Sequence, residues 1–384
     1  MRICITLLSF LLSFTAVGQT TLPDTLAHAS DTLQSNNEEL WGTITNEIGK
    51  VAGSVKTGVK KKVKELNSFD RNYIETNYYN YSAMLQNTNY WQQYRFSAEN
   101  NLGVKQTINL SPRPAFKVGP YFGWRWIFLG YTMDIGKARK NTEFNLSLYS
   151  AKVGCDLVHI KNKADYKIGK INGFDGLHSN AMNGHSFDGL KAYSTMANVY
   201  YVFNHKHFSY PAAYAQSTVQ RISAGSFILG LRYEYHKLRF DHTRLPYALQ
   251  FDEQGADRLL PAMKIDKIKY YNAALSFGYA YNWVFAKNFL FNISLTPALG
   301  YKKTIGTPWE KSVLIEDVKS FNIDFTGRTA IVWNNTRTYA GASFITYGYG
   351  YKKAHFNFRN FVNYLNIYVG INFHRKSQYR NNNK

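Results

Sequence analysis

The chain has 384 residues, of which 46 are Lys or Arg and 25 are Asp or Glu, so its formal net charge is +21. Aromatic residues make up 16% of it, and no stretch contains eighteen consecutive apolar residues, which excludes a membrane-spanning helix. Only Cys155 lies beyond the first twenty residues, which excludes a scaffold held together by disulfides once those residues are removed.

The first eighteen residues predict a secretory signal peptide. Arg2 is a short basic region, residues 5–14 form an apolar core, and Ala16-Val17-Gly18 resembles a cleavage site. The apolar core is too short to span a bilayer and is followed by polar sequence, which argues against an anchor. We therefore expect cleavage near Gly18, export and, given the pattern described below, a location in the bacterial outer membrane. Export argues against nucleic acid as the partner of this basic chain.

Residues 19–39 are polar and aperiodic and are expected to be a flexible lead. Residues 40–66 predict an amphipathic periplasmic helix, because apolar residues recur there every three or four positions and the lysines lie mostly elsewhere on the helical wheel. Three locations are open for this helix: docked on an apolar periplasmic partner, lying on an anionic membrane surface, or inserted into the barrel as a plug. Residues 67–93 are expected to be a lead-in.

A period of two dominates from residue 94 to residue 373. In the segment 222–238, Phe227, Leu229, Leu231, Tyr233 and Tyr235 alternate with small or charged residues. Such alternation is typical of a β-strand with two different faces, and an apolar outer face with a polar inner face is typical of a barrel in lipid. Strands are predicted at 94–110, 115–124, 127–135, 142–160, 165–172, 191–204, 222–238, 268–285, 288–302, 320–333, 337–351 and 361–373.

The predicted fold class is all-β, an antiparallel transmembrane barrel of about 12 strands, followed by a basic tail over residues 374–384. An even number of strands places both ends of the barrel in the periplasm. Short turns at 125–126, 287–288 and 334–335 then lie on the periplasmic side, and the long loops 173–190, 239–267 and 303–319 lie outside. A secreted β-sandwich is the alternative fold, although it would have to bury an aromatic face on nearly every strand.

One stretch resembles a known family. It contains Tyr201-Val-Phe-Asn204, His207-Phe-Ser-Tyr-Pro211, Ala212-Ala213, Gln216, Gln220-Arg221 and Ser223-Ala-Gly-Ser226, and Phe69-Asp70 with Tyr73-Ile74 fits the family's start. These residues resemble the hallmark of an uncharacterised family of Bacteroidetes proteins, the domain of unknown function 4421, over roughly residues 68–374. The resemblance implies an outer-membrane barrel and brings no catalytic residues. The chain departs from the pattern in its tail after Phe373.

Charged residues on the predicted inner faces are the first candidate site. They are Arg125, Asp134, Asp156, Arg232, Glu234, His236, Lys302, Asp324 and Arg328. Two interpretations are open: an internal network of ion pairs that fills a narrow barrel, or a constriction that selects ions or small anions.

Two connecting segments are further candidates. The loop 205–221 is long for a periplasmic turn, and Gln216, Arg221, Ser223 and Ser226 either form a polar cluster in the lower barrel or permit a tight chain reversal. The loop 173–190 contains His178 and His185 beside serines and aspartates, which allows a Ser–His nucleophile or a metal site, although its repeated FDGL indicates paired turns. We expect no cofactor and no metal.

The preferred interpretation is a non-enzymatic outer-membrane barrel, either a small-solute channel or an envelope component that contacts anionic lipopolysaccharide. The alternatives are a lipid-modifying hydrolase that uses loop 173–190 and a surface barrel whose outer loops bind glycan or protein. The expected partners are therefore outer-membrane lipid, lipopolysaccharide and small solutes.

Overall fold

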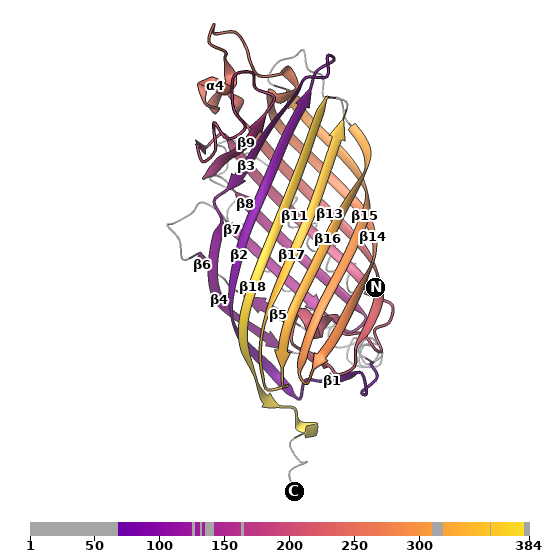
Figure 1. Ribbon diagram of the computed structural model, residues 1–384. Coiled ribbons are helices and arrows are strands. Elements are labelled where there is room, and N and C mark those ends of the chain that lie inside the picture. Colours follow the sequence, from indigo (N-terminus) through magenta and orange to yellow (C-terminus); the bar gives the residue numbers. More distant parts are fainter. Residues whose placement is uncertain are drawn as a thin grey trace, which may run out of the picture. The chain divides into compact units, whose positions relative to one another are not determined.

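A computed structural model describes residues 68–379, except 125–126, 131–132, 135–141, 163–164, 309–317 and 354. These residues form one extended antiparallel sheet and a small two-stranded sheet (Figure 1). The strands are β1 (Ile74–Thr76), β2 (Tyr79–Glu99), β3 (Lys105–Pro112), β4 (Ala115–Trp124), β5 (Ile127–Gly130), β6 (Met133–Asp134), β7 (Thr142–Tyr149), β8 (Val153–Asn162), β9 (Tyr166–Asn172), β10 (Ser186–Phe187), β11 (Leu190–Val202), β12 (Thr218–Gln220), β13 (Ala224–Phe240), β14 (Ile265–Ala286), β15 (Phe289–Pro308), β16 (Val318–Asn334), β17 (Thr338–Lys353) and β18 (Phe356–Arg375).

Helical elements are short and lie in the connections. They are α3 (Tyr210–Tyr214), η1 (His242–Arg244), α4 (Tyr247–Gln250), η2 (Pro261–Met263) and η3 (Ser377–Tyr379). Ser209 caps α3 by accepting a hydrogen bond from the Ala212 amide, and Pro211 occupies the first turn, where its missing N–H costs nothing. Within the residues described, none of these helices is long and apolar enough to cross a membrane.

The strand pairings return to their starting point. From β2 they run through β18, β17, β16, β15, β14, β13, β11, β8, β7, β5 and β4, and β4 pairs with β2 again, which makes a ring of twelve strands in the described residues. Beyond this ring, β2 pairs with β3, which leads to β9 and the edge strand β10. The sheet is therefore not closed over its whole length.

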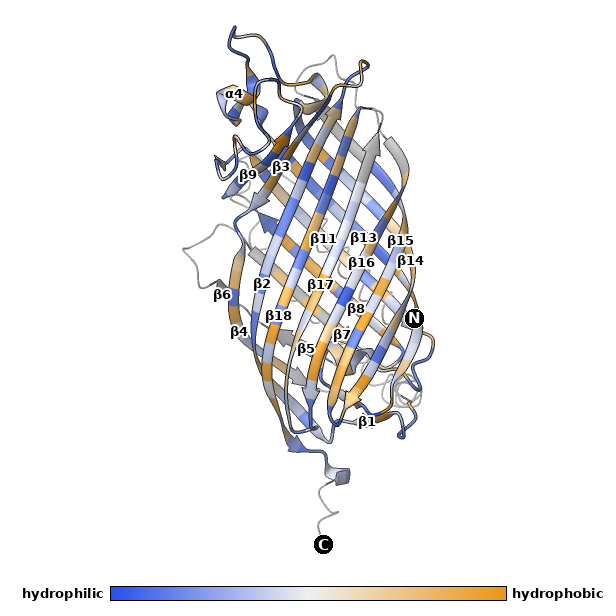
Figure 2. Cartoon of the chain, in the orientation of Figure 1, coloured by the Kyte–Doolittle hydropathy of each residue, from blue (hydrophilic) through white to orange (hydrophobic). Residues whose placement is uncertain are grey.

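Alternation separates the two faces of the ring. On β13, Leu231 is 66% exposed whereas its neighbour Arg232 is 5% exposed, and Figure 2 shows hydrophobic and hydrophilic positions interleaved along the strands. On β14, every second residue from Tyr271 to Trp283 is exposed, and each is apolar or aromatic. Twelve residue steps at about 3.3 Å, on a strand tilted by about 40°, cover roughly 30 Å, which is the thickness of the hydrocarbon core of a bilayer.

Aromatic and aliphatic side chains occupy different levels of this outer face. Large exposed aromatics lie near the lower end, among them Trp124, Trp283 and Phe373, while Leu231, Leu275 and Leu299 lie between them and the tyrosines of the upper end. Aromatic girdles that border an aliphatic band are typical of barrels in lipid, because aromatic rings favour the headgroup level. The exposed apolar surface is thus explained by a membrane rather than by a soluble sandwich.

Two predicted strands are wrong as single elements. The range 94–110 is split by a turn after Glu99, where Gly103 adopts a φ of +78°, and β2 begins at Tyr79, inside the expected lead-in 67–93. The range 142–160 is split into β7 and β8, because the Ser150 side chain bonds with Val153 and reverses the chain. The count of twelve survives because β3 and β9, two of the resulting fourteen strands, lie outside the ring.

The two ends of the ring differ as predicted. β1 and the end of β18 lie at the lower end of Figure 1, together with the short turns 287–288 and 335–337, whereas the connection that contains η1, α4 and η2 lies at the upper end. β18 extends to Arg375, so the basic tail expected from residue 374 starts inside the last strand. The predicted signal peptide, flexible lead and helix 40–66 lie outside the described residues.

Candidate functional site: the barrel interior

Alternation directs seven ionisable side chains into the ring. Asp156, Arg232, Glu234, His236, Lys302, Asp324 and Arg328 all lie at positions that are at most 8% exposed. They come from β8, β13, β15 and β16, so the ring brings together residues that are up to 172 positions apart. Arg232, Glu234, His236, Asp324 and Arg328 therefore lie together in the interior.

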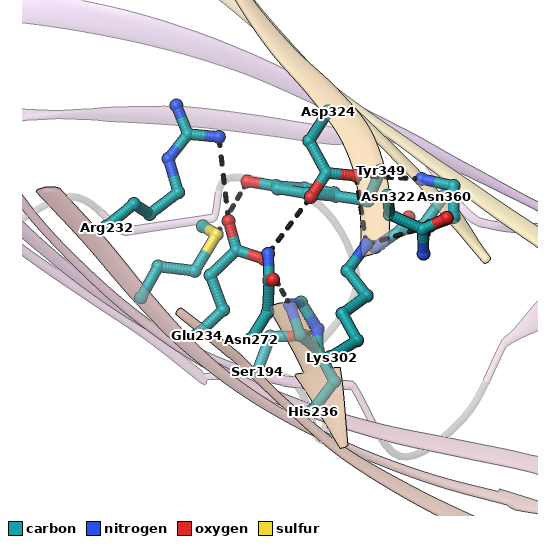
Figure 3. A network of polar contacts seen from close by, with 12 residues as sticks. Ser194, Arg232, Glu234, His236, Asn272, Lys302, Asn322, Asp324, Tyr349 and Asn360 are labelled. Carbon is teal, nitrogen blue, oxygen red and sulfur yellow. Dashed lines mark hydrogen bonds and ion pairs between the residues drawn. The ribbon is translucent and has the colours of Figure 1, made fainter. Parts of the chain in front are cut away.

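Glu234 is the centre of the upper part of this network (Figure 3). Its carboxylate lies 3.6 Å from Arg232 Nη1 and 3.6 Å from His236 Nε2, and it accepts a hydrogen bond of 3.1 Å from Asn272 Nδ2. His236 Nδ1 lies 2.8 Å from Ser194 Oγ. This Ser–His–Glu sequence of contacts resembles a catalytic relay, but Ser194 and Glu234 are buried in the barrel, so substrate has no direct access to them.

Asp324 joins this group to a second ion pair. Asn272 Nδ2 also donates to Asp324 Oδ2 at 2.9 Å, and Lys302 Nζ donates to Asp324 Oδ1 at 2.9 Å and to the Gly350 carbonyl at 2.8 Å. Asp324 and Asn272 are fully buried, and Lys302 is 1% exposed. A buried ammonium and carboxylate are stable only when paired and hydrogen-bonded, as both are here.

Arg328 forms the lower part of the network. Its Nη2 donates to Asp156 Oδ2 at 3.0 Å, and its guanidinium lies 5.7 Å from the ring centres of Tyr200 and Tyr210 and 5.9 Å from that of Tyr214. Aromatic faces stabilise a cation that has lost its water. The three cations Arg232, Lys302 and Arg328 equal in number the three carboxylates Asp156, Glu234 and Asp324, so the charges of these six groups cancel.

The connection between β11 and β13 folds into the lower end of the ring. In it, Tyr210 Oη bonds with Ser294 Oγ at 2.8 Å and Tyr214 Oη donates to Asn292 Oδ1 at 2.6 Å. Both partners are buried, inward-facing residues of β15, so α3 lies inside the barrel. We call residues 204–222 the inserted segment. The sequence predicts a long turn here, with a polar cluster in the lower barrel or a tight chain reversal as the two interpretations.

Gln220 fixes the inserted segment and was not among the predicted site residues. Its Oε1 accepts from the Ser209 amide at 2.9 Å and from Asn282 Nδ2 at 3.0 Å, and its Nε2 donates to the His207 and Ile222 carbonyls at 2.6 and 2.8 Å. A buried amide with all these bonds joins the segment to the wall of the barrel. The pairing of β1 with β12 joins the same segment to residues 74–76.

The predicted cluster of Gln216, Arg221, Ser223 and Ser226 does not form. Gln216 donates to Tyr368 Oη at 2.7 Å, whereas Arg221 pairs with Glu75 and donates to Asn288 Oδ1 at the lower mouth. Ser223 and Ser226 accept from the amides of Val284 and Asn204, each at 2.9 Å. These residues position the inserted segment from four different points, so the proposal of one polar cluster is wrong.

An apolar cluster fills the upper end. It contains Phe96, Ile108, Ile168 and Phe240 together with Leu249 of α4, all at most 2% exposed. The repeated FDGL of loop 173–190 contributes the buried side chains of Phe174 and Phe187, which explains the repeat better than paired turns do.

The chemical candidates in loop 173–190 gain no support from the geometry. His178 and His185 are exposed, and no hydrogen bond joins either ring to a serine of the loop in the described residues. Throughout the described ranges, no three His, Cys, Asp or Glu side chains are grouped as metal ligands would be. Arg125 lies outside the described residues, and the side chain of Asp134 is likewise not described.

Comparison with solved structures finds outer-membrane proteins at low structural similarity and very low sequence identity. The outer membrane protease OmpT from Escherichia coli is 7% identical, with a TM-score of 0.39 over 77% of this chain and 97% of that one. The P. putida toluene transporter TodX is 9% identical, with a TM-score of 0.26 over 81% and 100%, respectively. The outer membrane protein OprG from Pseudomonas aeruginosa is 11% identical, with a TM-score of 0.24 over 78% and 100%.

No curated protein matches this chain in sequence. A family model does: it matches residues 68–373 and is described as a domain of unknown function, DUF4421. The match begins six residues before β1, ends within β18, and includes the whole ring and the inserted segment. The chain therefore belongs to the DUF4421 family.

Proposed function

We propose that this protein is a non-conducting outer-membrane barrel that serves as a structural component of the envelope. Its location in the outer membrane is supported by the outward band of apolar residues, which is about as tall as a bilayer core, and by the aromatic residues at both of its edges. Apart from the inserted segment, the described connections at the end that holds β1 and the end of β18 are tight turns, and the long connection between β13 and β14 lies at the other end, which agrees with the usual orientation of such barrels.

One observation favours a filled barrel over a channel: the inward-facing polar side chains are buried. In a water-filled pore these groups would be hydrated, as in porins. Here Glu234, Asn272 and Asp324 are fully buried and bonded to one another across the interior. The inserted segment fills the lower end and the apolar cluster fills the upper end.

The proposal is tested by planar-bilayer recording of the refolded full-length chain, with an open porin as positive control. Folding is verified separately by heat-modifiable mobility on a gel. We expect no steady current from the folded protein at moderate voltage. Steady ohmic current from folded wild-type protein would overturn the proposal.

A channel that opens by movement of the inserted segment is a second candidate. It is favoured by the position of that segment, which fills one end of the ring and is joined through β12 to β1. A variant in which residues 205–221 are replaced by Asn-Gly separates the two. If the central network fills the barrel, this variant stays silent, whereas current from the variant alone would favour a gated channel.

A further inference from the structure

The outer face carries a second group of charges, above the upper tyrosines. On β13 and β14, Tyr235 is opposite Tyr271, and the next outward residues are Lys237 opposite Lys269, then Arg239 opposite Lys267. β11 adds Lys191 opposite Arg239. We call Lys191, Lys237, Arg239, Lys267 and Lys269 the basic belt.

The belt places like charges directly opposite one another. Cβ atoms of opposed residues in an antiparallel pair are about 5 Å apart, and like charges in such positions destabilise the sheet. The two opposed pairs Lys237–Lys269 and Arg239–Lys267 lie side by side on the same face. In the described residues, the carboxylate that contacts the belt is Asp266, 3.6 Å from Arg239 Nε. Five cations therefore share one anion.

Tyr193 helps to fix the belt at one height. Its ring lies 5.6 Å from Lys237 Nζ, and on its other side it lies 5.7 Å from Lys161 Nζ of β8. Ammonium groups held against a tyrosine of the upper girdle lie at the level where lipid headgroups begin. The belt thus faces the membrane side of the rim and does not belong to the protruding connections.

Charges on the inner face of β13 are paired with opposite charges, whereas those on its outer face lie opposite like charges. Inside the ring, Arg232 and Glu234 of β13 belong to a network with equal numbers of cations and carboxylates. Outside, three to seven residues further along the same strand, Lys237 and Arg239 are opposed by further cations. Charges are therefore compensated in the interior, whereas on the outer face at the upper rim, the level that we assign to lipid headgroups, five cations face one carboxylate.

We propose that the basic belt binds the phosphate groups of lipopolysaccharide in the outer leaflet. Phosphate suits the site, because the two cations of each opposed pair are close enough to contact the same phosphate group. Lysine is also a good point-charge partner for phosphate. This inference rests on the proposed outer-membrane location, and it does not depend on whether the barrel conducts.

The test uses the refolded full-length chain in a neutral detergent. Binding of bisphosphorylated lipid A, of its dephosphorylated form and of phosphatidylglycerol is measured by native mass spectrometry. The belt variant is the triple substitution Lys237→Gln, Lys267→Gln and Lys269→Gln. The matched control removes three equally charged, exposed side chains from β3 and β9: Lys105→Gln, Lys167→Gln and Lys170→Gln.

We expect lipid A to bind the wild type and the control, and the belt variant to lose affinity on the order of 100-fold, which corresponds to roughly fivefold per lysine. Affinity for lipid A should also fall as salt is raised. Equal affinity of the belt and control variants, or undiminished binding of dephosphorylated lipid A, would overturn the proposal. Equal affinity for phosphatidylglycerol would refute the assignment to lipopolysaccharide.

The two proposals fail in different ways. A folded barrel that neither conducts nor binds lipid A would refute only the proposed lipid site. A barrel that conducts and binds lipid A would refute only the proposal of a filled interior. Removal of three repelling lysines should leave folding intact, because the like-charge pairs destabilise the sheet. Loss of binding with unchanged heat-modifiable mobility can then be read directly as loss of the site.

Discussion

Replacement of Lys302 by Met tests whether the interior is held by compensated charges. Lys302 Nζ lies 2.9 Å from Asp324 Oδ1, and both side chains are almost fully buried. At an effective dielectric constant of about 20, Coulomb attraction at this distance is on the order of 6 kcal/mol. The desolvation penalty is several kcal/mol for each ion, so the intact pair is close to neutral in free energy.

Removal of one partner leaves the other charge buried without compensation. We therefore expect Lys302→Met to lower the free energy of unfolding by about 3–5 kcal/mol. Asp324→Asn should be similarly costly, since Lys302 would lose its carboxylate partner and keep only neutral ones, such as the Gly350 carbonyl and the Tyr270 ring. The double variant should lose much less than the sum of the two, with a coupling energy of about 3 kcal/mol.

The assay is urea unfolding of the refolded barrel in lipid vesicles, followed by tryptophan fluorescence. Lys303→Met is the matched control, because Lys303 is the next residue of β15 and is exposed on the outer face. That change should alter stability by no more than about 0.5 kcal/mol. Additive losses in the double variant, or a loss below about 1 kcal/mol for Lys302→Met, would refute the account of a self-compensated interior.

Three further predictions concern the outer face, the inserted segment and the upper connection. Leu231→Arg, in the middle of the exposed band, should destabilise the barrel in a bilayer by about 2–4 kcal/mol, whereas Tyr235→Arg near the rim should cost about 0–1 kcal/mol; equal costs would contradict the assigned membrane level. Tyr214→Phe removes the bond to buried Asn292 and should cost about 1–3 kcal/mol in urea unfolding, while Tyr247→Phe in the exposed α4 should have no measurable effect. Hydrogen bonds from Thr243, with a further one from Arg244, lower the pKa of Asp241. The stability that the ionised Asp241 adds to the upper connection is therefore complete above about pH 4 and is lost as the pH falls through the lowered pKa. Opening of residues 242–250, measured by hydrogen exchange, should become more frequent over this fall in pH in the wild type but not in the Asp241→Asn variant.

Alternation alone was sufficient to predict the fold class and most strands. From β13 to β18, most inward and outward residues follow the period of two, because each face meets a uniform environment. The two strands that were wrongly joined are those in which alternation passes through a turn, and the early start of β2 at Tyr79 was also missed. At 100–104, Asn100 Oδ1 accepts from the amides of Leu102 and Val104 and closes a short reversal that hydropathy does not detect.

The inserted segment had a local signal that the sequence interpretation left unused. Ser209 followed by Pro211 is a typical helix start, and a helix inside a periplasmic connection has to pack on something. Its buried small and aromatic residues, Ala212, Ala213 and Tyr210, point to an apolar environment. The residues of the barrel wall to which it bonds, Asn282, Asn292 and Ser294, are more than sixty residues away in sequence.

The partners within the network could not have been predicted. Inward positions follow from alternation, but the meeting of Arg328 with Asp156 depends on strand tilt and on the shift in register around the ring. If the register around the ring changed by one residue, Arg328 would lie opposite a different residue of β8. The sequence therefore predicts which charges face inward but not which of them form pairs.

The basic belt accounts for part of the net charge of the chain. A net charge of +21 in a lumen would repel cations and favour anion passage, but the interior charges described here cancel. Unbalanced cations lie instead on the outer face of β11, β13 and β14, above the tyrosines. A protein selected for conduction would place its excess charge where the solute passes. The basic belt carries part of this excess at the level that we propose for lipid headgroups, so the outer rim is the surface on which we would first look for a function.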